Sequence, residues 1–132
     1  MQAQQHLAMT CRDLEASKAF YETHLGFRVA RTFRDGDGNV FYMMRLGPFC
    51  LEMFQSGDPD AAELTYGGLG FSHLAFSVPD LDAKIAELSA NGVAMGEVVD
   101  GSFYIPGLRL CFFEDPDGNR LEINEGMTDE VA

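Results

Sequence analysis

Two histidines and two glutamates recur in the chain at similar spacings. Glu52 follows His6 by 46 residues, and Glu122 follows His73 by 49 residues. Each glutamate lies between two apolar residues, and each histidine is followed by a leucine. Side chains alternate between the two faces of a strand, so the apolar neighbours would pack on one face and the four ionisable groups would lie on the other.

Two imidazoles and two carboxylates that meet at one point need a compensating charge. Neighbouring carboxylates repel each other, and removal from water disfavours their charged form. A divalent cation removes both costs, and a mixed nitrogen and oxygen set leaves room for water on a six-coordinate ion. We therefore predict that His6, Glu52, His73 and Glu122 bind one divalent metal ion.

The sequence around each histidine is repeated. HLAMTCRDL at 6–14 aligns with HLAFSVPDL at 73–81, with identical residues at five of the nine positions. An amphipathic helix pattern follows each copy and ends at a glycine. Asp13 and Asp80 are the predicted N-caps, because a carboxylate accepts from the exposed N–H groups of the first turn. The chain is therefore predicted to contain a duplicated unit.

Three segments with strand character follow each predicted helix, separated by turn signals that contain Gly, Pro, Asp and Asn. The segments are residues 27–34, 40–46 and 49–55 in the first half, and 93–99, 108–113 and 119–124 in the second. Each half therefore has the order β-α-β-β-β. The predicted fold class is α+β, with two βαβββ modules.

The length suits one compact domain, since 132 residues with 46% hydrophobic content are too few for two independent ones. We predict a single domain at 1–126, with modules at about 1–56 and 71–126. A linker rich in Gly, Asp and Pro at 57–70 would join them. Residues 127–132 are predicted to form an acidic tail.

The charge balance disfavours several classes of partner. Nine Lys and Arg against 21 Asp and Glu give a net charge of −12, which would repel nucleic acid and anionic lipid surfaces. The chain has no apolar run long enough to span a membrane and no signal peptide pattern, so we expect a soluble, cytoplasmic protein. The three cysteines lie far apart and predict neither a disulfide framework nor a thiolate zinc site.

Several strings of residues carry a resemblance to a known family. They are HLAM with His6, the helix ending FYETHLGF, CLEMF with Glu52, HLAFSV with His73, and FFEDPDGNRLEI with Glu122. Over nearly its whole length the chain resembles the vicinal oxygen chelate superfamily (glyoxalase, bleomycin resistance protein and dioxygenase), and within it the short bacterial glyoxalase I enzymes. The resemblance implies two βαβββ modules whose sheets form an open, metal-containing cleft.

The same resemblance implies a reaction and a cofactor. It implies an octahedral ion, Ni²⁺ or Zn²⁺ with Mn²⁺ and Co²⁺ as alternatives, in a metal-dependent lyase or isomerase of the glyoxalase I type. A hemithioacetal would lose its C1 proton to a carboxylate, pass through an enediolate and regain the proton at the neighbouring carbon. Glu122 is the expected base, with Glu52 as its counterpart. A homodimer is expected, with modules paired within one chain or exchanged between two.

The expected substrate-binding residues depart from the glyoxalase I pattern. Thr10 and Ser56 stand where those enzymes have the Arg and Asn that help to hold glutathione, and Arg12 or Arg109 is the alternative source of a cation. Strand alternation places further side chains on the ligand face. The predicted substrate-binding set is Thr10, Cys50, Phe54, Ser56, Ser77 and Asn124.

Other functions remain open at this stage. A small-molecule binding protein resembling bleomycin-type resistance factors would trap its ligand without metal or catalysis. A metal-dependent antibiotic-modifying transferase is expected to show two His and one Glu. Epimerases of the superfamily are expected to have Gln in the second ligand place, and its dioxygenases use two His and one carboxylate. The intact His, Glu, His, Glu order favours the lyase.

Overall fold

The structure is a computed structural model that describes residue 1 and residues 3–58, 60–62, 64 and 68–130. The chain divides into two compact units, Met1–Glu63 and Leu64–Ala132. Part of the predicted linker at 57–70, and residues 131–132 of the predicted tail, lie outside the described residues. The predicted domain limits therefore stay a prediction.

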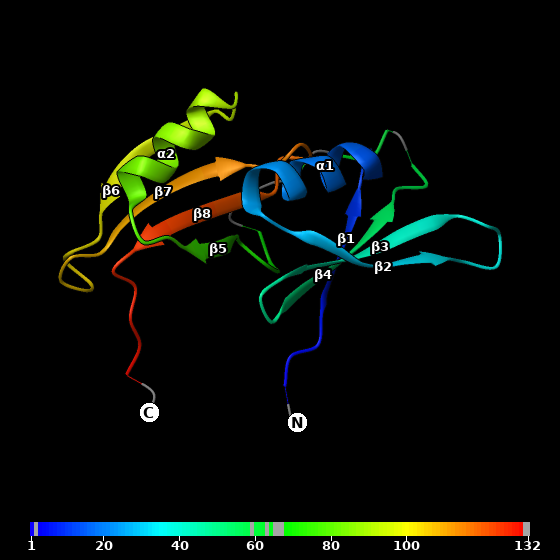
Figure 1. Cartoon of the computed structure of the whole chain (residues 1–132), viewed down its shortest axis with the longest axis horizontal. Coiled ribbons are helices and arrows are strands. Elements are labelled where there is room, and N and C mark those ends of the chain that lie inside the picture. The colour runs from blue at the N-terminus through cyan, green and yellow to red at the C-terminus, as the bar shows by residue number, and fades with distance from the viewer. Residues whose placement is uncertain (2, 59, 63, 65–67, 131–132) are drawn as a thin grey trace. The chain divides into compact units, whose positions relative to one another are not determined.

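The first unit is one βαβββ module (Figure 1). Strand β1 and helix α1 are followed by a three-stranded meander, and the sheet order is β1-β4-β3-β2. β1 runs parallel to β4, while β2 and β3 pair antiparallel, as do β3 and β4. The elements are β1 (Leu7–Cys11), α1 (Leu14–Leu25), β2 (Arg28–Arg34), β3 (Val40–Leu46) and β4 (Phe49–Gln55).

The second unit repeats this topology. Its sheet order is β5-β8-β7-β6, with β5 parallel to β8 and the other neighbours antiparallel. The elements are β5 (Leu74–Ser77), α2 (Leu81–Ala90), β6 (Met95–Asp100), β7 (Arg109–Glu114) and β8 (Arg120–Glu125). The predicted α+β class and the two βαβββ modules are confirmed.

The strands of the second unit differ slightly from the predicted bounds. The segment predicted at 93–99 begins at Met95, because Val93 N–H donates to the carbonyl of Leu88 and so still belongs to the helix ending. Gly92 has φ +87°, the left-handed conformation that such an ending requires. The segments predicted at 108–113 and 119–124 each begin and end one residue later.

Both helices begin as predicted. Asp13 Oδ1 accepts from Ala16 N–H at 3.0 Å, and Asp80 Oδ1 accepts from Ala83 N–H at 3.0 Å. These bonds satisfy N–H groups that have no partner inside the helix, which stabilises each helix by about 1 kcal/mol.

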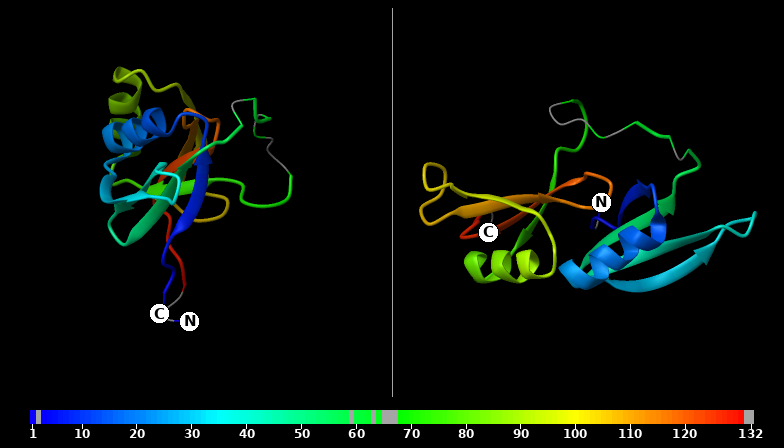
Figure 2. Two further views of the ribbon diagram at one scale, coloured as in Figure 1. Left: turned by 90° about the vertical axis from the view of Figure 1, so that its right-hand side faces the viewer. Right: turned by 90° about the horizontal axis from the view of Figure 1, so that it is seen from above.

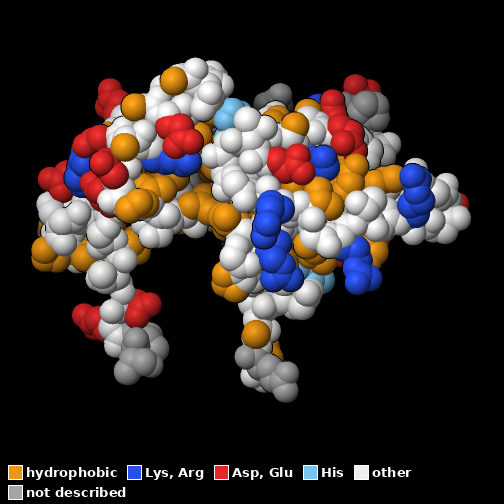
Figure 3. Space-filling model, viewed as in Figure 1, with side chains coloured by type: hydrophobic (Ala, Val, Ile, Leu, Met, Phe, Trp, Pro, Cys, Tyr) orange, Lys and Arg blue, Asp and Glu red, His pale blue; other side chains and the backbone are white. Residues whose placement is uncertain are grey.

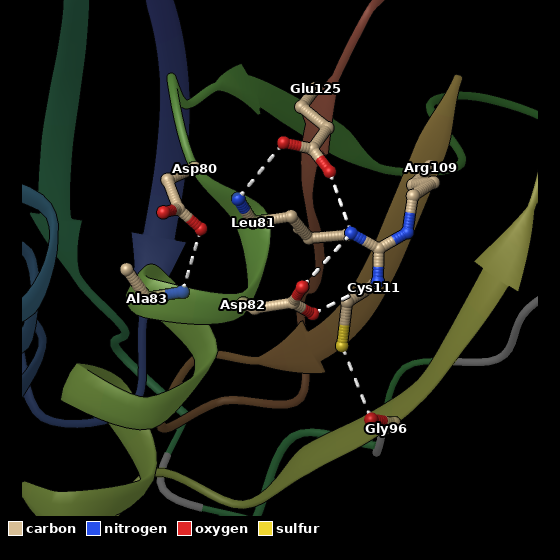
Figure 4. A network of polar contacts seen from close by, with 8 residues as sticks. All are labelled: Asp80, Leu81, Asp82, Ala83, Gly96, Arg109, Cys111 and Glu125. Atoms are coloured by element: carbon tan, nitrogen blue, oxygen red, sulfur yellow. Dashed lines mark hydrogen bonds and ion pairs between the residues drawn. The ribbon is translucent and has the colours of Figure 1, made fainter. Parts of the chain in front are cut away.

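The last residue of each fourth strand also holds the helix start. Gln55 Oε1 accepts from Leu14 N–H at 2.9 Å. In the second unit Glu125 Oε2 accepts from Leu81 N–H at 3.2 Å (Figure 4). The duplicated units therefore share this contact, which anchors each helix to its own sheet.

Each helix covers one face of its own sheet (Figure 2). α1 contacts β1 and β4, and α2 contacts β6, β7 and β8. Buried apolar side chains from each helix and from the sheet beneath it form the core, and they include Leu14, Tyr21, Met44, Leu51, Met53, Leu81, Leu88, Cys111, Phe113, Leu121 and Ile123. Among the described residues of each unit no helix covers the opposite face of the sheet, and Glu52 of β4 and Glu122 of β8 project there.

The three cysteines are free and buried. Burial raises the pKa of the Cys111 thiol, and its Sγ lies 3.2 Å from the carbonyl oxygen of Gly96 (Figure 4). A thiol that is neutral and inaccessible reacts slowly. We expect none of the three thiols of the native protein to react rapidly with a disulfide reagent at pH 8, and all three to react in guanidinium chloride. One fast thiol in the native protein would contradict this burial.

Arg109 ties α2 to the sheet of the second unit (Figure 4). Its Nη2 lies 2.9 Å from Asp82 Oδ1, and its Nη1 lies 2.7 Å from Glu125 Oε1. The hydrogen bonds from Arg109 lower the pKa of Asp82 below its ordinary value. The folded state therefore holds this proton less tightly than the unfolded state. The stabilisation is present above the ordinary pKa of about 3.9 and is lost as the pH falls through the lowered pKa.

We expect Asp82→Asn to lower the urea midpoint slightly at pH 7. The midpoint should also decrease less between pH 7 and pH 3 in this variant than in the wild type. Urea unfolding at pH 7 and pH 3 measures both effects. Glu97→Gln, at an exposed position of β6, removes one carboxylate without touching this network and serves as the control. An equal loss of stability on acidification in Asp82→Asn and in the wild type would show that the ion pair does not contribute.

The segment that follows β8 carries exposed acidic side chains, drawn in red in Figure 3. Residues 127–130 have no helix or strand. Within the ranges that the structure describes, neither helix is long and apolar enough to cross a membrane.

Candidate metal and substrate site

His73 and Glu122 meet in the second unit. Glu122 lies in β8, and His73 directly precedes β5, the parallel neighbour of β8. His73 Nε2 is 2.9 Å from Glu122 Oε2. The other ring nitrogen of His73, Nδ1, is 3.0 Å from Ser72 Oγ. A partner on Nδ1 orients the imidazole and leaves Nε2 directed at the carboxylate.

His6 and Glu52 form the corresponding pair in the first unit. Glu52 lies in β4, His6 directly precedes β1, and the two strands are parallel neighbours. His6 Nε2 is 3.7 Å from Glu52 Oε1, while His6 Nδ1 contacts Gln5 Oε1. The two groups are farther apart than in the counterpart pair, and the Glu52 side chain is more exposed, at 18% against 7% for Glu122.

The strand registers place each glutamate on the face of its sheet that lies opposite the helix. Glu52 is paired with Ala8 and Met43, and Glu122 with Ala75 and Phe112. Their sequence neighbours on β4 and β8 are buried in the core. The alternation inferred from the sequence therefore matches the side-chain arrangement inside each unit.

The predicted substrate-binding residues fall into three groups. Thr10 pairs with Phe54 in the first unit, and Ser77 pairs with Asn124 in the second, on the faces that carry the glutamates. Cys50 has the same strand phase as Glu52 but is only 2% exposed. Ser56 lies beyond β4, where its Oγ is 2.9 Å from the carbonyl oxygen of Asp58. Their role in substrate binding stays a prediction.

Phe54 was predicted beside these pairs, but the aromatic residues that contact it and His73 were not. Phe54 stacks on Phe41 with ring centroids 4.8 Å apart, and Phe41 stacks on Phe33 at the same spacing. In the second unit the ring of Phe112 makes an edge contact with that of His73, at 5.3 Å. Only the strand register brings these rings together, and the sequence does not reveal a register.

Of the two arginines considered as a substitute cation, Arg109 does not lie on the face that carries Glu122. Arg109 has the strand phase of the buried Cys111, and it bonds to Asp82 and Glu125 beside α2. Arg12 Nη2 donates to the carbonyl oxygen of Ala61 at 2.9 Å. Arg109 in particular is directed toward the helix face of its sheet.

Each unit thus supplies one imidazole and one carboxylate that converge. These are ligand types that Ni²⁺, Zn²⁺, Mn²⁺ and Co²⁺ accept. In neither unit do the described residues gather three or more His, Cys, Asp or Glu side chains in one cluster. One pair alone offers fewer ligands than the three or four protein side chains of a usual zinc site.

The comparison with protein families agrees with this fold. The family model of the Glyoxalase/Bleomycin resistance protein/Dioxygenase superfamily matches residues 3–123. The chain belongs to this superfamily, and the resemblance noted in the sequence is confirmed.

Individual relatives are similar to this chain over most of their length. It is 36% identical over 122 residues to uncharacterized protein YwkD of Bacillus subtilis, covering 91% of this chain and 94% of that protein. It is 30% identical over 136 residues to a lactoylglutathione lyase of Haemophilus influenzae, covering 93% and 92%. The crystal structure of a glyoxalase family protein from Enterococcus faecalis matches with a TM-score of 0.80 and 31% identity, covering 94% and 98%.

Proposed function

We propose that this protein is a metal-dependent lyase or isomerase of the glyoxalase I type. Its substrate would be a small molecule with two vicinal oxygens, such as the hemithioacetal of methylglyoxal and a thiol. The observation that carries the proposal is the duplicated contact of His73 with Glu122 at 2.9 Å and of His6 with Glu52 at 3.7 Å. The likeness to a lactoylglutathione lyase supports the reaction class.

His6, Glu52, His73 and Glu122 would hold the ion, with nickel or zinc as first candidates and manganese or cobalt as alternatives. Two carboxylates balance the double charge, and two neutral imidazoles complete the protein ligands. A bound divalent ion would supply the positive charge that stabilises an oxyanion developing on the substrate. Because one His and one Glu come from each unit, the proposed site requires both units.

The carboxylates would carry out the proton transfer. Glu122 is the proposed base, which takes the C1 proton and returns it to the neighbouring carbon, and Glu52 is its counterpart. Glu122 is suited to this task because His73 contacts one carboxylate oxygen and the side chain is almost fully buried. A buried and oriented carboxylate needs little rearrangement before it accepts a proton.

Substrate contacts would come from Thr10, Cys50, Phe54, Ser56, Ser77 and Asn124. Neither Thr10 nor Ser56 can supply the cationic fork of the Arg that helps glyoxalase I enzymes to hold glutathione. The residues at these two positions therefore do not favour glutathione over a smaller thiol. A homodimer, with modules paired within or between chains, is proposed on the resemblance alone.

Metal analysis combined with turnover tests the proposal. We expect one divalent ion per chain after loading with Ni²⁺ or Zn²⁺, and isomerisation of the methylglyoxal–glutathione hemithioacetal or of the hemithioacetal with a smaller thiol. Absorbance of the thioester product reports turnover. Binding of an ion without turnover of any hemithioacetal would remove the lyase assignment, and absence of binding would remove the metal site as well.

One observation favours a second candidate, a small-molecule binding protein without catalysis. The row of stacked rings formed by Phe33, Phe41 and Phe54 lies on the same sheet face as Glu52. Aromatic rings bind planar apolar ligands through large contact areas. Tight binding of a planar aromatic antibiotic by protein stripped of metal, together with no turnover, would favour this candidate.

A further inference from the structure

Asn124 is in direct contact with the carboxylate of Glu122. Both side chains belong to β8, two residues apart and on the same face. Asn124 Nδ2 donates to Glu122 Oε1 at 2.9 Å, while His73 Nε2 lies 2.9 Å from Oε2. Asn124 is 3% exposed and Glu122 is 5% exposed. Each oxygen of this buried carboxylate is therefore held by a different side chain.

The chemistry of the two groups sets the orientation of the Asn124 amide. An ionised carboxylate only accepts hydrogen bonds, so the NH₂ group must face Glu122 and Oδ1 must face away from it. Asn124 Oδ1 is buried, and the described part of the chain offers it no hydrogen-bond partner. A buried acceptor without a donor costs folding free energy, and a hydrogen bond from a bound molecule would remove that cost.

The repeat shows that this arrangement is not a general property of the fold. Phe54 stands two residues after Glu52, where Asn124 stands after Glu122. Phe54 has no hydrogen-bonding side chain and stacks on Phe41 instead. The duplicated carboxylates thus differ, because an amide restrains Glu122 and a phenyl ring stands at the matching place beside Glu52.

We propose that Asn124 is a positioning residue for Glu122 and that its Oδ1 accepts a hydrogen bond from a hydroxyl group of the substrate. This inference rests on the proposed function. The amide would fix the rotation of the Glu122 carboxylate, so that Oε2 stays directed to the ligand site beside His73. The preferred substrate would then carry a hydroxyl on one of its two vicinal carbons, as a hemithioacetal does.

The restraint on Glu122 is tested with cobalt, whose visible absorption reports the arrangement of its ligands. Full-length wild type and Asn124→Leu, a variant of similar size without polar groups, are titrated with Co²⁺. Loss of an outer hydrogen bond to a metal ligand typically weakens metal affinity 10–100-fold. We expect about 10-fold weaker Co²⁺ binding and an altered spectrum in Asn124→Leu. Wild-type affinity and spectrum in this variant would overturn the positioning role.

A control separates positioning from a simple loss of stability. Ile123→Val alters the buried side chain between Glu122 and Asn124, which points to the opposite face beneath α2. We expect Ile123→Val to lower the melting temperature and to keep the Co²⁺ affinity and spectrum of the wild type. A wild type that binds no Co²⁺ would instead overturn the proposed function, and this inference with it.

The acceptor role of Oδ1 is tested with two neutral probes on the Co²⁺-loaded proteins. Hydroxyacetone carries a hydroxyl beside its carbonyl, and methoxyacetone lacks the donor. We expect the wild type to bind hydroxyacetone more tightly than methoxyacetone. In Asn124→Leu the ratio of the two affinities should fall about three- to tenfold, which is the effect of one hydrogen bond. An unchanged preference in Asn124→Leu would overturn the contact between Oδ1 and the substrate hydroxyl.

Discussion

Replacing Glu122 by Gln is expected to lower kcat for hemithioacetal isomerisation by about 10²–10⁴-fold, the usual contribution of a positioned general base. The amide of Gln has nearly the shape of the carboxylate but accepts no proton at neutral pH. It also removes one negative charge from the ligand set, so metal affinity should fall. Stopped-flow measurement of turnover at saturating metal separates the loss of the base from the loss of the ion.

Glu125→Gln is the matched control for this experiment. Glu125 lies on the same strand as Glu122, but it faces α2, where it bonds to Leu81 N–H and Arg109. The same chemical change there should reduce stability slightly and leave kcat and metal affinity unaltered. Equal kcat in Glu122→Gln and in the wild type would rule out Glu122 as the base. The corresponding Glu52→Gln variant would then show whether its counterpart carries the proton.

Local sequence signals predicted most of this fold. Asp13 and Asp80 cap their helices as expected, and both are confirmed by hydrogen bonds to the N–H group three residues later. The duplication made the prediction stronger, because the same β-α-β-β-β order was inferred twice from different residues. In the structure the first and last strands of each module are neighbours, β1 with β4 and β5 with β8, and this pairing brings each histidine beside its glutamate.

What the sequence could not supply was the register between strands. A bulge between Val29 and Arg31 shifts the pairing of β2 with β3, and this shift sets Phe33 opposite Phe41. Local patterns do not predict such a shift. The hydrogen bond between Asn124 and Glu122 was also not predicted. A spacing of two residues on one strand does not by itself indicate such a bond, since Phe54 stands at the same spacing from Glu52 on β4 and forms none.

The position of Arg109 was not predicted, although the sequence carried a signal for it. Arg109, Cys111 and Phe113 alternate with Leu110 and Phe112 along β7, and the structure buries Cys111 and Phe113 in the core. Alternation therefore places Arg109 on the helix face. The mixture of apolar residues on both faces of β7 obscured this phase in the sequence, whereas β4 and β8 each carry one acidic residue between two apolar neighbours.

Loading with metal is expected to raise the melting temperature, on the order of 10 °C. A ligand that binds only the folded state stabilises it by about 4 kcal/mol at a free concentration 1,000 times its Kd, and each kcal/mol raises the melting temperature by several degrees in a protein of this size. Thermal unfolding with Ni²⁺ or Zn²⁺, compared with the same protein in a chelator, measures the shift.

The response of single variants decides whether the two pairs act together. If His6, Glu52, His73 and Glu122 hold one ion jointly, then His6→Ala and His73→Ala should each remove most of the shift, because either change leaves three protein ligands. His24→Gln is the control, since His24 lies in α1 and is the remaining histidine of the three in the chain. If instead each pair binds an ion of its own, each variant would keep about half of the shift, and the wild type would bind two ions. That outcome would contradict the four-ligand site, whereas a melting temperature that no divalent ion changes would contradict metal binding altogether.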